Sequence, residues 1–337
     1  MNLTENDLVF VTGATGLVGS HVVEECRKRN IPVRALARSS SSADFLKEWN
    51  VDIVTGDLTH AESLQKGVEG ATVVVHCAAK VGDWGPVEDY RSVNVDGLET
   101  LLQAAEQNGT LKKFVHISSL GVYQARDHHG TDESEPPNKE GIDGYTLTKV
   151  ESELKVLDHV KEKQLPAVVV RPGFVYGPRD RTVLPRIFEK LKSKQFAFLG
   201  SGEKLMNNVY VGNLIQVIFK AIENDDVIGE RFNVTDGRLV SKKEFIDRIA
   251  ELGSYPEPKK HVPLGVAKVL ATVLEKVYRA LGKTEAPILS SARIKFLGLN
   301  LDYSIEKAKK ELDYDPQIDF QEGMQRTMNW FKEQGLT

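Results

Sequence analysis

Two residues four positions apart, Tyr145 and Lys149, offer the clearest chemistry in this sequence. On a helix, that spacing places both side chains on one face. A free phenol has a pKa near ~10, so a neighbouring ammonium is needed to make the phenolate accessible at neutral pH. The phenol could then give a proton to a ketone oxygen, or take one from a hydroxyl, while a hydride moves from or to a nicotinamide. The hydroxyl of Ser119 would hydrogen-bond the same oxygen.

The same spacing occurs twice more, at Tyr255 and Lys259 and at Tyr303 and Lys307, so spacing alone is weak evidence. The prolines that follow Tyr255 prevent a regular helix there. Tyr303 follows no strand that ends in serines. The serine-bearing strand end and the long helix that begins near Tyr145 therefore favour the Tyr145 pair.

The helix predicted over 143–164 also carries an apolar stripe. The stripe consists of Leu147, Val150, Leu154 and Leu157. Tyr145 and Lys149 lie off this stripe, so its packing against the core does not explain them. The alternative is an ordinary tyrosine and lysine on a solvated helix face.

A glycine turn lies near the amino terminus, where an apolar strand leads to Gly13, Gly16 and Gly19. Gly13 permits a tight turn, Gly16 lets the backbone approach a pyrophosphate, and Gly19 lets the following helix pack on the strand. The helix start adds free N–H groups and the positive end of the helix dipole. We predict a nucleotide phosphate site here. Its residues are Gly13, Thr15, Gly16, Leu17, Val18 and Gly19.

Strand-like and helix-like segments alternate through the first half of the chain. Further strands are predicted at 33–37, 51–54, 72–76, 114–118 and 167–171, and helices at 17–29, 61–68, 86–108 and 143–164. This alternation predicts an α/β fold of the Rossmann type, with a doubly wound parallel sheet. Because ligands bind where the strand carboxyl ends line up, chemistry is expected just after each strand.

After Pro172 the alternation breaks down, which predicts a smaller C-terminal substrate-binding lobe. We assign residues 1–175 to the dinucleotide-binding domain, with 207–224 returning to it. Residues 176–206 and 225–337 are assigned to the substrate-binding lobe. The length of 337 residues is ample for both parts.

Composition narrows the class of protein. The chain is 41% hydrophobic and 27% charged, with a net charge of −4, so it offers no basic face for nucleic acid. Cys26 and Cys77 have neither metal-ligand spacing nor a disulfide framework, which favours the reducing cytoplasm. His128 and His129 lack further ligands at matching spacing, so we expect them in a solvent-facing loop and predict no metal site. The amino terminus lacks a signal-peptide pattern, and no run of about eighteen apolar residues predicts a membrane span.

The sequence resembles the extended short-chain dehydrogenase/reductase superfamily, of the NAD-dependent epimerase/dehydratase type, along nearly its whole length. The matching segments are 12–19, 56–58, 76–79, 94–97, 118–119, 145–149 and 171–178. The resemblance implies that the catalytic residues are Tyr145, Lys149 and Ser119, with Ser119 rather than Ser118 as the serine. The further cofactor-binding residues that it implies are Asp57 and Leu58 at the adenine, Ala78, Ala79 and Lys80 along the ribose and nicotinamide, and Pro172, Gly173 and Val175 at the carboxamide, besides Tyr145 and Lys149.

Within the superfamily, residues 79–86 and 207–213 resemble the 3β-hydroxysteroid dehydrogenase branch. That branch includes sterol dehydrogenases and bacterial reductases of long-chain 2-alkyl-3-oxoalkanoates, which implies an NAD(P)-dependent oxidoreductase acting on a small hydrophobic substrate. Nucleotide-sugar epimerases and dehydratases tend to carry an arginine where this chain has residues 206–208. That alternative stays open because other arginines are available, namely Arg179, Arg181, Arg186 and Arg293. A second alternative is a non-catalytic dinucleotide-binding regulator, although such relatives usually lack the tyrosine and lysine pair.

Cofactor choice rests on Arg38, at the end of the second predicted strand. An acidic residue there would bind the ribose 2′-hydroxyl of NAD, whereas Arg38 and the four serines at 39–42 offer a cation and hydroxyls to a 2′-phosphate. NADP(H) is therefore the preferred cofactor. NAD(H) is the alternative if Arg38 merely stacks on the adenine or caps the sheet.

The substrate pocket is expected to be mainly apolar, with Trp84, Phe174 and Tyr176 as substrate contacts after the strand ends. A helical apolar stripe recurs at Val266, Leu270, Val273, Val277 and Leu281, and Ala267, Leu274 and Tyr278 widen it. This helix could be a lid over the substrate, a contact with a membrane surface, or an ordinary helix packed on its own domain. We expect ordinary packing, and we expect the protein to be a homodimer.

Overall fold

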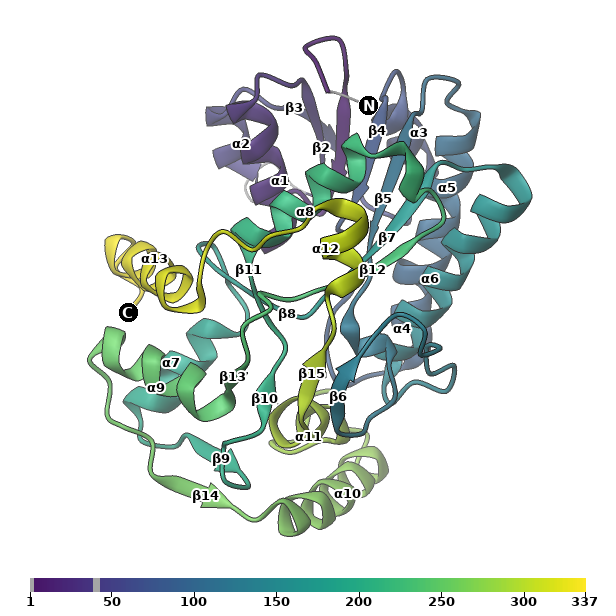
Figure 1. Ribbon diagram of the computed structural model, residues 1–337. Coiled ribbons are helices and arrows are strands. Elements are labelled where there is room, and N and C mark those ends of the chain that lie inside the picture. The colour runs from purple at the N-terminus through teal and green to yellow at the C-terminus, as the bar shows by residue number, and fades with distance from the viewer. Residues whose placement is uncertain (1–2, 39–42) are drawn as a thin grey trace.

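The computed structural model describes residues 3–38 and 43–337 (Figure 1). Within these residues, seven parallel strands form a central sheet in the order β12-β7-β5-β4-β1-β2-β3. The strands are β1 (Val9–Thr12), β2 (Val33–Ala37), β3 (Asp52–Thr55), β4 (Val73–His76), β5 (Lys113–Ile117), β7 (Ala167–Pro172) and β12 (Arg231–Val234). Since β1 lies between β2 and β4, the strand order reverses there, and the predicted doubly wound α/β fold is confirmed.

The strand sequences explain why this sheet is covered on both faces. β1 reads Val-Phe-Val-Thr and β4 reads Val-Val-Val-His, and every residue of both strands is buried. Val9 and Val11 pack into one core, whereas Phe10 packs into the other. Runs of β-branched residues buried on both faces are typical of parallel sheets between two helical layers.

Helices from the first two thirds of the chain supply these layers (Figure 1). The core around Val9 includes α1 (Leu17–Lys28), α2 (Asp44–Glu48) and α8 (Val211–Glu223). The core around Phe10 includes α3 (Ala61–Val68), α5 (Gly97–Gln107) and α6 (Gly144–Lys163). The single helix predicted over 86–108 is divided into α4 (Val87–Arg91), a π-helical turn (Ser92–Asp96) and α5.

A second body of structure lies below the sheet in Figure 1. Its helices are α7 (Leu184–Lys192), α9 (Lys242–Gly253), α10 (Leu264–Ala280), α11 (Ser291–Gly298) and α13 (Phe320–Glu333). Short strand pairs brace it: β6 (His128–Thr131) with β15 (Leu301–Tyr303), β8 (Phe174–Tyr176) with β11 (Asn208–Tyr210), β9 (Ala197–Leu199) with β14 (Lys260–Val262), and β10 (Leu205–Met206) with β13 (Val240–Ser241).

β12 comes from the segment 225–337, which the sequence pattern assigned wholly to the substrate-binding lobe. It pairs in parallel with β7 at the edge of the central sheet, and α12 (Glu306–Leu312) packs against it. The chain therefore re-enters the sheet late. Alternation could not reveal this four-residue strand, because nearly sixty residues separate it from β7. The division into two lobes otherwise stays a prediction.

His128 is buried, which corrects its expected place in solvent. Its ring nitrogens lie 2.9 Å from Thr131 Oγ1 and 2.9 Å from Gln124 O, and its ring packs on Tyr303 with centroids 4.6 Å apart. His129 is exposed, as expected. In the described ranges, no group of three or more His, Cys, Asp or Glu side chains could hold a metal ion, and no helix combines the length and apolar character needed to cross a membrane.

Candidate active site

α6 begins at a capping box, which fixes where its first side chains point. Asp143 Oδ1 accepts a hydrogen bond from Thr146 N (2.7 Å), and Thr146 Oγ1 accepts one from Asp143 N (3.2 Å). This reciprocal pair satisfies two backbone amides at the helix start. Tyr145 follows in the first turn and Lys149 one turn later, so both approach the carboxyl end of β5.

Lys149 is 4% exposed, so the alternative of a lysine on a solvated helix face is wrong. Its Nζ donates a hydrogen bond to the carbonyl oxygen of Ile117, the last residue of β5, at 2.6 Å. Burial lowers the pKa of Lys149 to about 8, against the opposing effect of the Glu153 carboxylate. Lys149 is therefore mostly charged at neutral pH but gives up its proton more readily than an exposed lysine.

Tyr145 is half-buried, and its phenol interacts with the hydroxyl of Ser119. Burial raises the pKa of Tyr145, whereas the hydrogen bond with Ser119 lowers it. Ser118 is buried instead, and its hydroxyl donates to Glu153 Oε2 at 2.9 Å. The structure therefore brings Tyr145, Lys149 and Ser119 to one strand end and turns Ser118 away from them.

The buried face of α6 is largely polar, which corrects the predicted apolar stripe. The buried side chains after Tyr145 are Thr146, Thr148, Lys149, Val150, Ser152, Glu153 and Val156. Of the stripe, Val150 is buried, whereas Leu147, Leu154 and Leu157 are half-buried at its margins. α6 therefore turns toward the sheet the face that carries the chemistry.

A fully buried ion pair lies one helical turn beyond Lys149. Glu153 and Arg171 are both 0% exposed; Arg171 Nε donates to Glu153 Oε2 at 2.9 Å, and a second guanidinium nitrogen pairs with Oε1. Arg171 Nη1 also donates to the hydroxyl of Tyr123 at 2.7 Å. Glu153 thereby joins α6, the end of β5 and the end of β7. The sequence analysis does not predict this role. The one available signal is that Glu153 stands four residues after Lys149, which places both side chains on one face of a helix.

The glycine turn has the geometry of a phosphate site. Gly13 has a φ of +68°, and a Cβ placed on it would lie 2.7 Å from Ala78 N. A Cβ on Gly19 would lie 2.3 Å from the carbonyl oxygen of Gly13, so both positions require glycine. α1 begins at Leu17 behind Gly16, with no acidic residue in its first turn. Its leading N–H groups therefore suit an anion, and the residues present fit a dinucleotide phosphate.

The loop after β4 is held between the glycine turn and α6. Ala78 N donates to Thr12 Oγ1 at 3.2 Å. Lys80 N donates to Asn94 Oδ1 at 2.7 Å, and Asn94 Nδ2 donates to Thr148 Oγ1 at 3.0 Å. Asn94, 3% exposed, thus fixes the backbone on which Ala78, Ala79 and Lys80 stand. The sequence pattern places Asn94 in a matching segment, 94–97, but does not predict this positioning role.

The residues predicted to contact the adenine and its ribose differ in how open their side chains are to a ligand. Asp57 Oδ1 accepts hydrogen bonds from the amide (2.8 Å) and hydroxyl (2.6 Å) of Thr59, and these contacts help to lower the Asp57 pKa. Leu58 is 4% exposed and packs in the core around Phe10, so little of its side chain is open to a ligand. Arg38 is exposed directly after β2. The serines at 39–42 lie outside the described residues.

The segment after β7 separates two predicted substrate contacts. A Cβ on Gly173 would lie 1.8 Å from the carbonyl oxygen of Asn207, so this position also requires glycine. Phe174 is half-buried and packs against Phe296, with ring centroids 5.1 Å apart. Tyr176 is 0% exposed, and its hydroxyl donates to Asp236 Oδ2 at 3.3 Å. Tyr176 therefore belongs to the core, which corrects its assignment as a substrate contact.

Trp84 ties the loop after β4 to the second body of structure. Its Nε1 donates to the carbonyl oxygen of Lys283 at 2.9 Å, and its ring meets that of Tyr278 edge-on at 6.3 Å. The neighbouring Asp83 pairs with Arg293 Nε at 2.7 Å. Trp84 is therefore half-buried against α10 and the segment that follows it.

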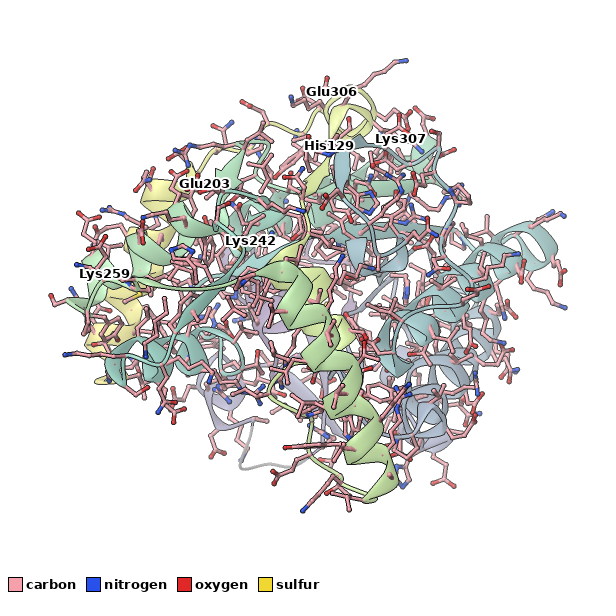
Figure 2. The ribbon with its side chains drawn as sticks, turned by 90° about the horizontal axis from the view of Figure 1, so that it is seen from below. His129, Glu203, Lys242, Lys259, Glu306 and Lys307 are labelled. Atoms are coloured by element: carbon pink, nitrogen blue, oxygen red, sulfur yellow. The ribbon has the colours of Figure 1, made fainter. Side chains whose placement is uncertain are left out.

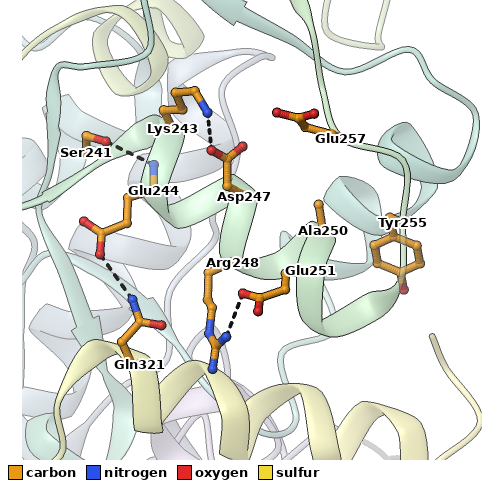
Figure 3. A pocket seen from close by; sticks show the side chains of 10 residues that line it. All are labelled: Ser241, Lys243, Glu244, Asp247, Arg248, Ala250, Glu251, Tyr255, Glu257 and Gln321. Atoms are coloured by element: carbon orange, nitrogen blue, oxygen red, sulfur yellow. Dashed lines mark hydrogen bonds and ion pairs between the residues drawn. The ribbon is translucent and has the colours of Figure 1, made fainter.

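Two surface hollows lie away from these residues. The larger, about 610 Å³, is on α9 and is lined by side chains of both signs, including the Lys243–Asp247 and Arg248–Glu251 pairs drawn in Figure 3. The other, about 560 Å³, lies on the outer side of α1 and includes Glu24. Neither contains a predicted catalytic residue, and their mixed charges suit solvated surface better than an apolar substrate.

Comparison with known proteins adds independent findings. Residues 9–235 match the NAD dependent epimerase/dehydratase family. The chain is 31% identical, over 317 residues and 94% of each chain, to the 4-hydroxy-2-methyl-3-oxo-4-farnesyl-3,4-dihydroquinoline-1-oxide ketoreductase of Stigmatella aurantiaca. It is 27% identical, over 329 residues, to the decarboxylating sterol-4-alpha-carboxylate 3-dehydrogenase of Mus musculus, covering 95% of this chain and 90% of that protein. These relatives confirm the resemblance to dehydrogenases and reductases of the hydroxysteroid type.

The fold is also similar to that of a solved nucleotide-sugar enzyme. The structure of UDP-glucuronic acid 4-epimerase from Bacillus cereus, in complex with NAD, has a TM-score of 0.78 and 21% sequence identity, covering 97% of this chain and 99% of that chain. At this identity the likeness concerns the fold alone. The family match and the glycine turn together support a nicotinamide dinucleotide as the ligand of this fold.

Proposed function

The chain belongs to the NAD dependent epimerase/dehydratase family, and we propose that it is an NADP(H)-dependent oxidoreductase that interconverts a secondary hydroxyl and a ketone on a hydrophobic substrate. The observation that carries this proposal is the meeting of Tyr145, Lys149 and Ser119 at the carboxyl end of β5, on the same sheet edge as the glycine turn. A bound nicotinamide would supply or accept the hydride.

Tyr145, Lys149 and Ser119 have different roles in this proposal. Tyr145 gives its phenolic proton to the oxygen of a ketone, or accepts it from a hydroxyl in the reverse direction. The Lys149 cation stabilises the phenolate that results and hydrogen-bonds the cofactor ribose. Ser119, which already interacts with the phenol, holds the reacting oxygen in line.

The cofactor lies, in this proposal, along the carboxyl edge of the sheet. Gly13, Thr15, Gly16, Leu17, Val18 and Gly19 bind its pyrophosphate, Asp57 and the Leu58 backbone meet the adenine, and Ala78, Ala79 and Lys80 with Pro172, Gly173 and Val175 flank the nicotinamide half. Arg38, exposed after β2, supports NADP(H) over NAD(H), because its guanidinium can pair with a 2′-phosphate.

A hydrophobic substrate is supported by the aromatic side chains near the site and by the named relatives. Trp84 and Phe174 are the proposed contacts, and the lobe formed by 176–206 and 225–337, apart from β12, would complete the pocket. Nucleotide sugars are a weaker candidate, because two of the four arginines named for a diphosphate are already paired, Arg179 with Glu24 and Arg293 with Asp83. Both arginines would have to leave those partners to bind a diphosphate.

We also propose a cytoplasmic location and a homodimer. Both cysteines of the chain fall in the described residues and are free thiols, which suits a reducing compartment. Sedimentation velocity of the purified chain tests the dimer.

The decisive test is Tyr145→Phe. Because the substitution removes just the proton donor, we expect cofactor binding to persist while kcat falls by about 10²–10⁴. NADPH and NADH titrations measure the binding, and NADPH oxidation measures turnover of 3-ketosteroids and 3-oxoacyl compounds. Chromatography of the products measures turnover of UDP-sugars, because an epimerase or dehydratase consumes no cofactor overall. Wild-type turnover by this variant on a substrate so identified would refute the assignment, and turnover of a UDP-sugar alone would favour an epimerase or dehydratase.

A further inference from the structure

α10 exposes most of its large apolar side chains to solvent. Every residue of this helix is described, and of these Ala267 and Ala271 are the buried ones. Six valines and leucines on α10 and its C-cap are between 42% and 66% exposed: Val266, Val269, Leu270, Val273, Val277 and Leu281. The expected packing on its own domain is therefore found at one edge of the stripe, at Ala267, and is wrong for the five valines and leucines that define the stripe. The contact is made at this edge instead: Ala267 and Ala271 belong to a small apolar core, and Tyr278 packs on Trp84.

The exposed residues form one continuous band. Their spacing of three and four positions places them on a single side of the helix. The described residues contain eleven large hydrophobic side chains that are exposed, and six of them are in this band. Single exposed hydrophobic residues are ordinary, but a band of this kind marks a surface that another apolar phase or molecule covers. Figure 2 shows α10 crossing the face of the molecule seen from below.

The charge around α10 is opposite in sign to that of the whole chain. Residues 257–285 hold six Lys and Arg against three Glu, in a protein with a net charge of −4. Lys268, Lys276 and Arg279 are exposed on the helix itself. Glu275 accepts hydrogen bonds from the amide (2.6 Å) and hydroxyl of Ser291, so it is directed toward the protein.

One end of the band adjoins the loop that leads to the candidate site. Tyr278 packs on Trp84, and Trp84 Nε1 bonds to Lys283 O beyond the C-cap. Val81, three residues before Trp84, is itself 63% exposed. The apolar band therefore ends beside Trp84, one of the proposed substrate contacts.

We propose that α10 docks in the headgroup region of an anionic lipid bilayer, with the band Val266–Leu281 among the acyl chains and the cations against the phosphates. Amphipathic helices with Val and Leu on one side and Lys or Arg on the other lie in membrane interfaces in this way. A second copy of this chain fits less well, because each copy would bring the same net positive charge of residues 257–285 to the pairing. The band does not form a lid over the candidate site, because a lid would turn its apolar side chains toward the protein and these side chains face solvent.

This docking goes beyond the proposed function and does not depend on it. If the substrate is hydrophobic as proposed, a second consequence follows: the substrate would reach the site from the bilayer in which it dissolves, past Trp84. That consequence, unlike the docking, rests on the proposed function.

Vesicle flotation with the purified full-length chain tests the docking. We expect binding to vesicles of phosphatidylcholine mixed with phosphatidylglycerol, weaker binding to phosphatidylcholine alone, and loss of the difference at high salt, because salt screens the cations. Val269→Glu and Val273→Glu should each reduce binding to the mixed vesicles by about tenfold or more, since each places a carboxylate in the apolar band. Glu is a good helix former, so α10 should persist in both variants.

Leu336→Glu is the matched control. Leu336 is 55% exposed near the carboxyl terminus, after α13 and away from α10 (Figure 1), so this variant should float like the wild type. Failure of the wild type to float, or equal flotation of the Val269 and Val273 variants, would overturn the proposal. So would a wild-type dimer that dissociates on Val273→Glu in sedimentation velocity without any vesicle binding, because the band would then be an interface between copies. NADPH titration of each variant tests the proposed cofactor site without vesicles. Loss of vesicle binding can therefore be told apart from a failure of the proposed function.

Discussion

Two helices of this protein reverse the usual distribution of side chains, in opposite directions. α6 buries a lysine and a glutamate against the sheet, whereas α10 holds valines and leucines in solvent. The buried charges of α6 all have partners within the chain: Glu153 has Arg171, and Lys149 has the Ile117 carbonyl. The exposed residues of α10 have no such cover within the described ranges. Within the described residues, the buried charges of α6 are therefore all paired, whereas the apolar band of α10 is left uncovered.

The energetic consequences differ accordingly. Burying a charge costs several kcal/mol and is tolerated where a partner and hydrogen bonds offset the cost. Leaving a valine exposed costs the fold little, because the same side chain is also exposed in the unfolded chain. Substitutions of the buried charged residues in α6 should therefore disturb folding and catalysis together, whereas substitutions in the exposed band of α10 should disturb association alone.

Glu153→Gln should have the largest effect on stability. It leaves Arg171 buried without its counter-charge, so we expect a loss of about 3–5 kcal/mol in the free energy of unfolding, measured with denaturant. Glu151→Gln is the matched control on the same helix: Glu151 pairs with the partly exposed Arg91 at 2.9 Å, and such pairs contribute about 1 kcal/mol or less. Equal losses in the free energy of unfolding for the two variants would show that the buried ion pair contributes no more to stability than the partly exposed one.

The protonation of Lys149 should set a pH limit on activity. With a pKa of about 8, its cation is lost as pH rises through that value, so kcat/KM for ketone reduction should fall there. Lys149→Arg keeps its charge, so any residual activity should lack this fall. Since the folded pKa lies below the ordinary 10.5, the unfolded chain binds more protons between pH 8 and 10.5, and the contribution of Lys149 to stability increases across that window. A profile that stays flat through pH 8 in the wild type would contradict this role.

Arg38→Asp should change cofactor preference without changing the fold. A carboxylate repels a 2′-phosphate and accepts a hydrogen bond from a 2′-hydroxyl, so the ratio of NADPH to NADH affinity should fall by about tenfold or more. Arg27→Asp, also exposed but at the end of α1, controls for the change in net charge. Unchanged relative affinities in titrations of both cofactors would mean that Arg38 does not contact the phosphate.

Val273→Glu should have the smallest effect on the isolated protein. Val273 is 51% exposed and lies outside the described cores, so the free energy of unfolding should change by less than about 0.5 kcal/mol. The contrast with Glu153→Gln is the sharpest form of the comparison between the two helices. A large loss of stability in this variant would show that α10 packs more tightly than its exposure indicates.

Much of the candidate site could be predicted from sequence because its features are local. The glycine turn follows an apolar strand, and Tyr145 stands four residues before Lys149 on a helix that follows a serine-bearing strand end. Spacing together with these neighbouring elements therefore pointed to both. The roles of Arg171 and Asn94 could not be found in this way. Each acts through a contact with α6 that joins residues 18 to 54 positions apart.

The sequence by itself indicated the alternation of strands and helices that is typical of a parallel sheet, the turn that suits a phosphate and the tyrosine–lysine pair. Each of these is a pattern carried by short stretches of the chain. Tertiary structure alone decided which faces are buried. An amphipathic pattern shows that α6 and α10 have two sides, but the partners that bury Glu153, and the absence of any such partner over Val273 within the described residues, depend on segments distant in sequence. The same dependence placed β12 in the sheet and Tyr176 in the core.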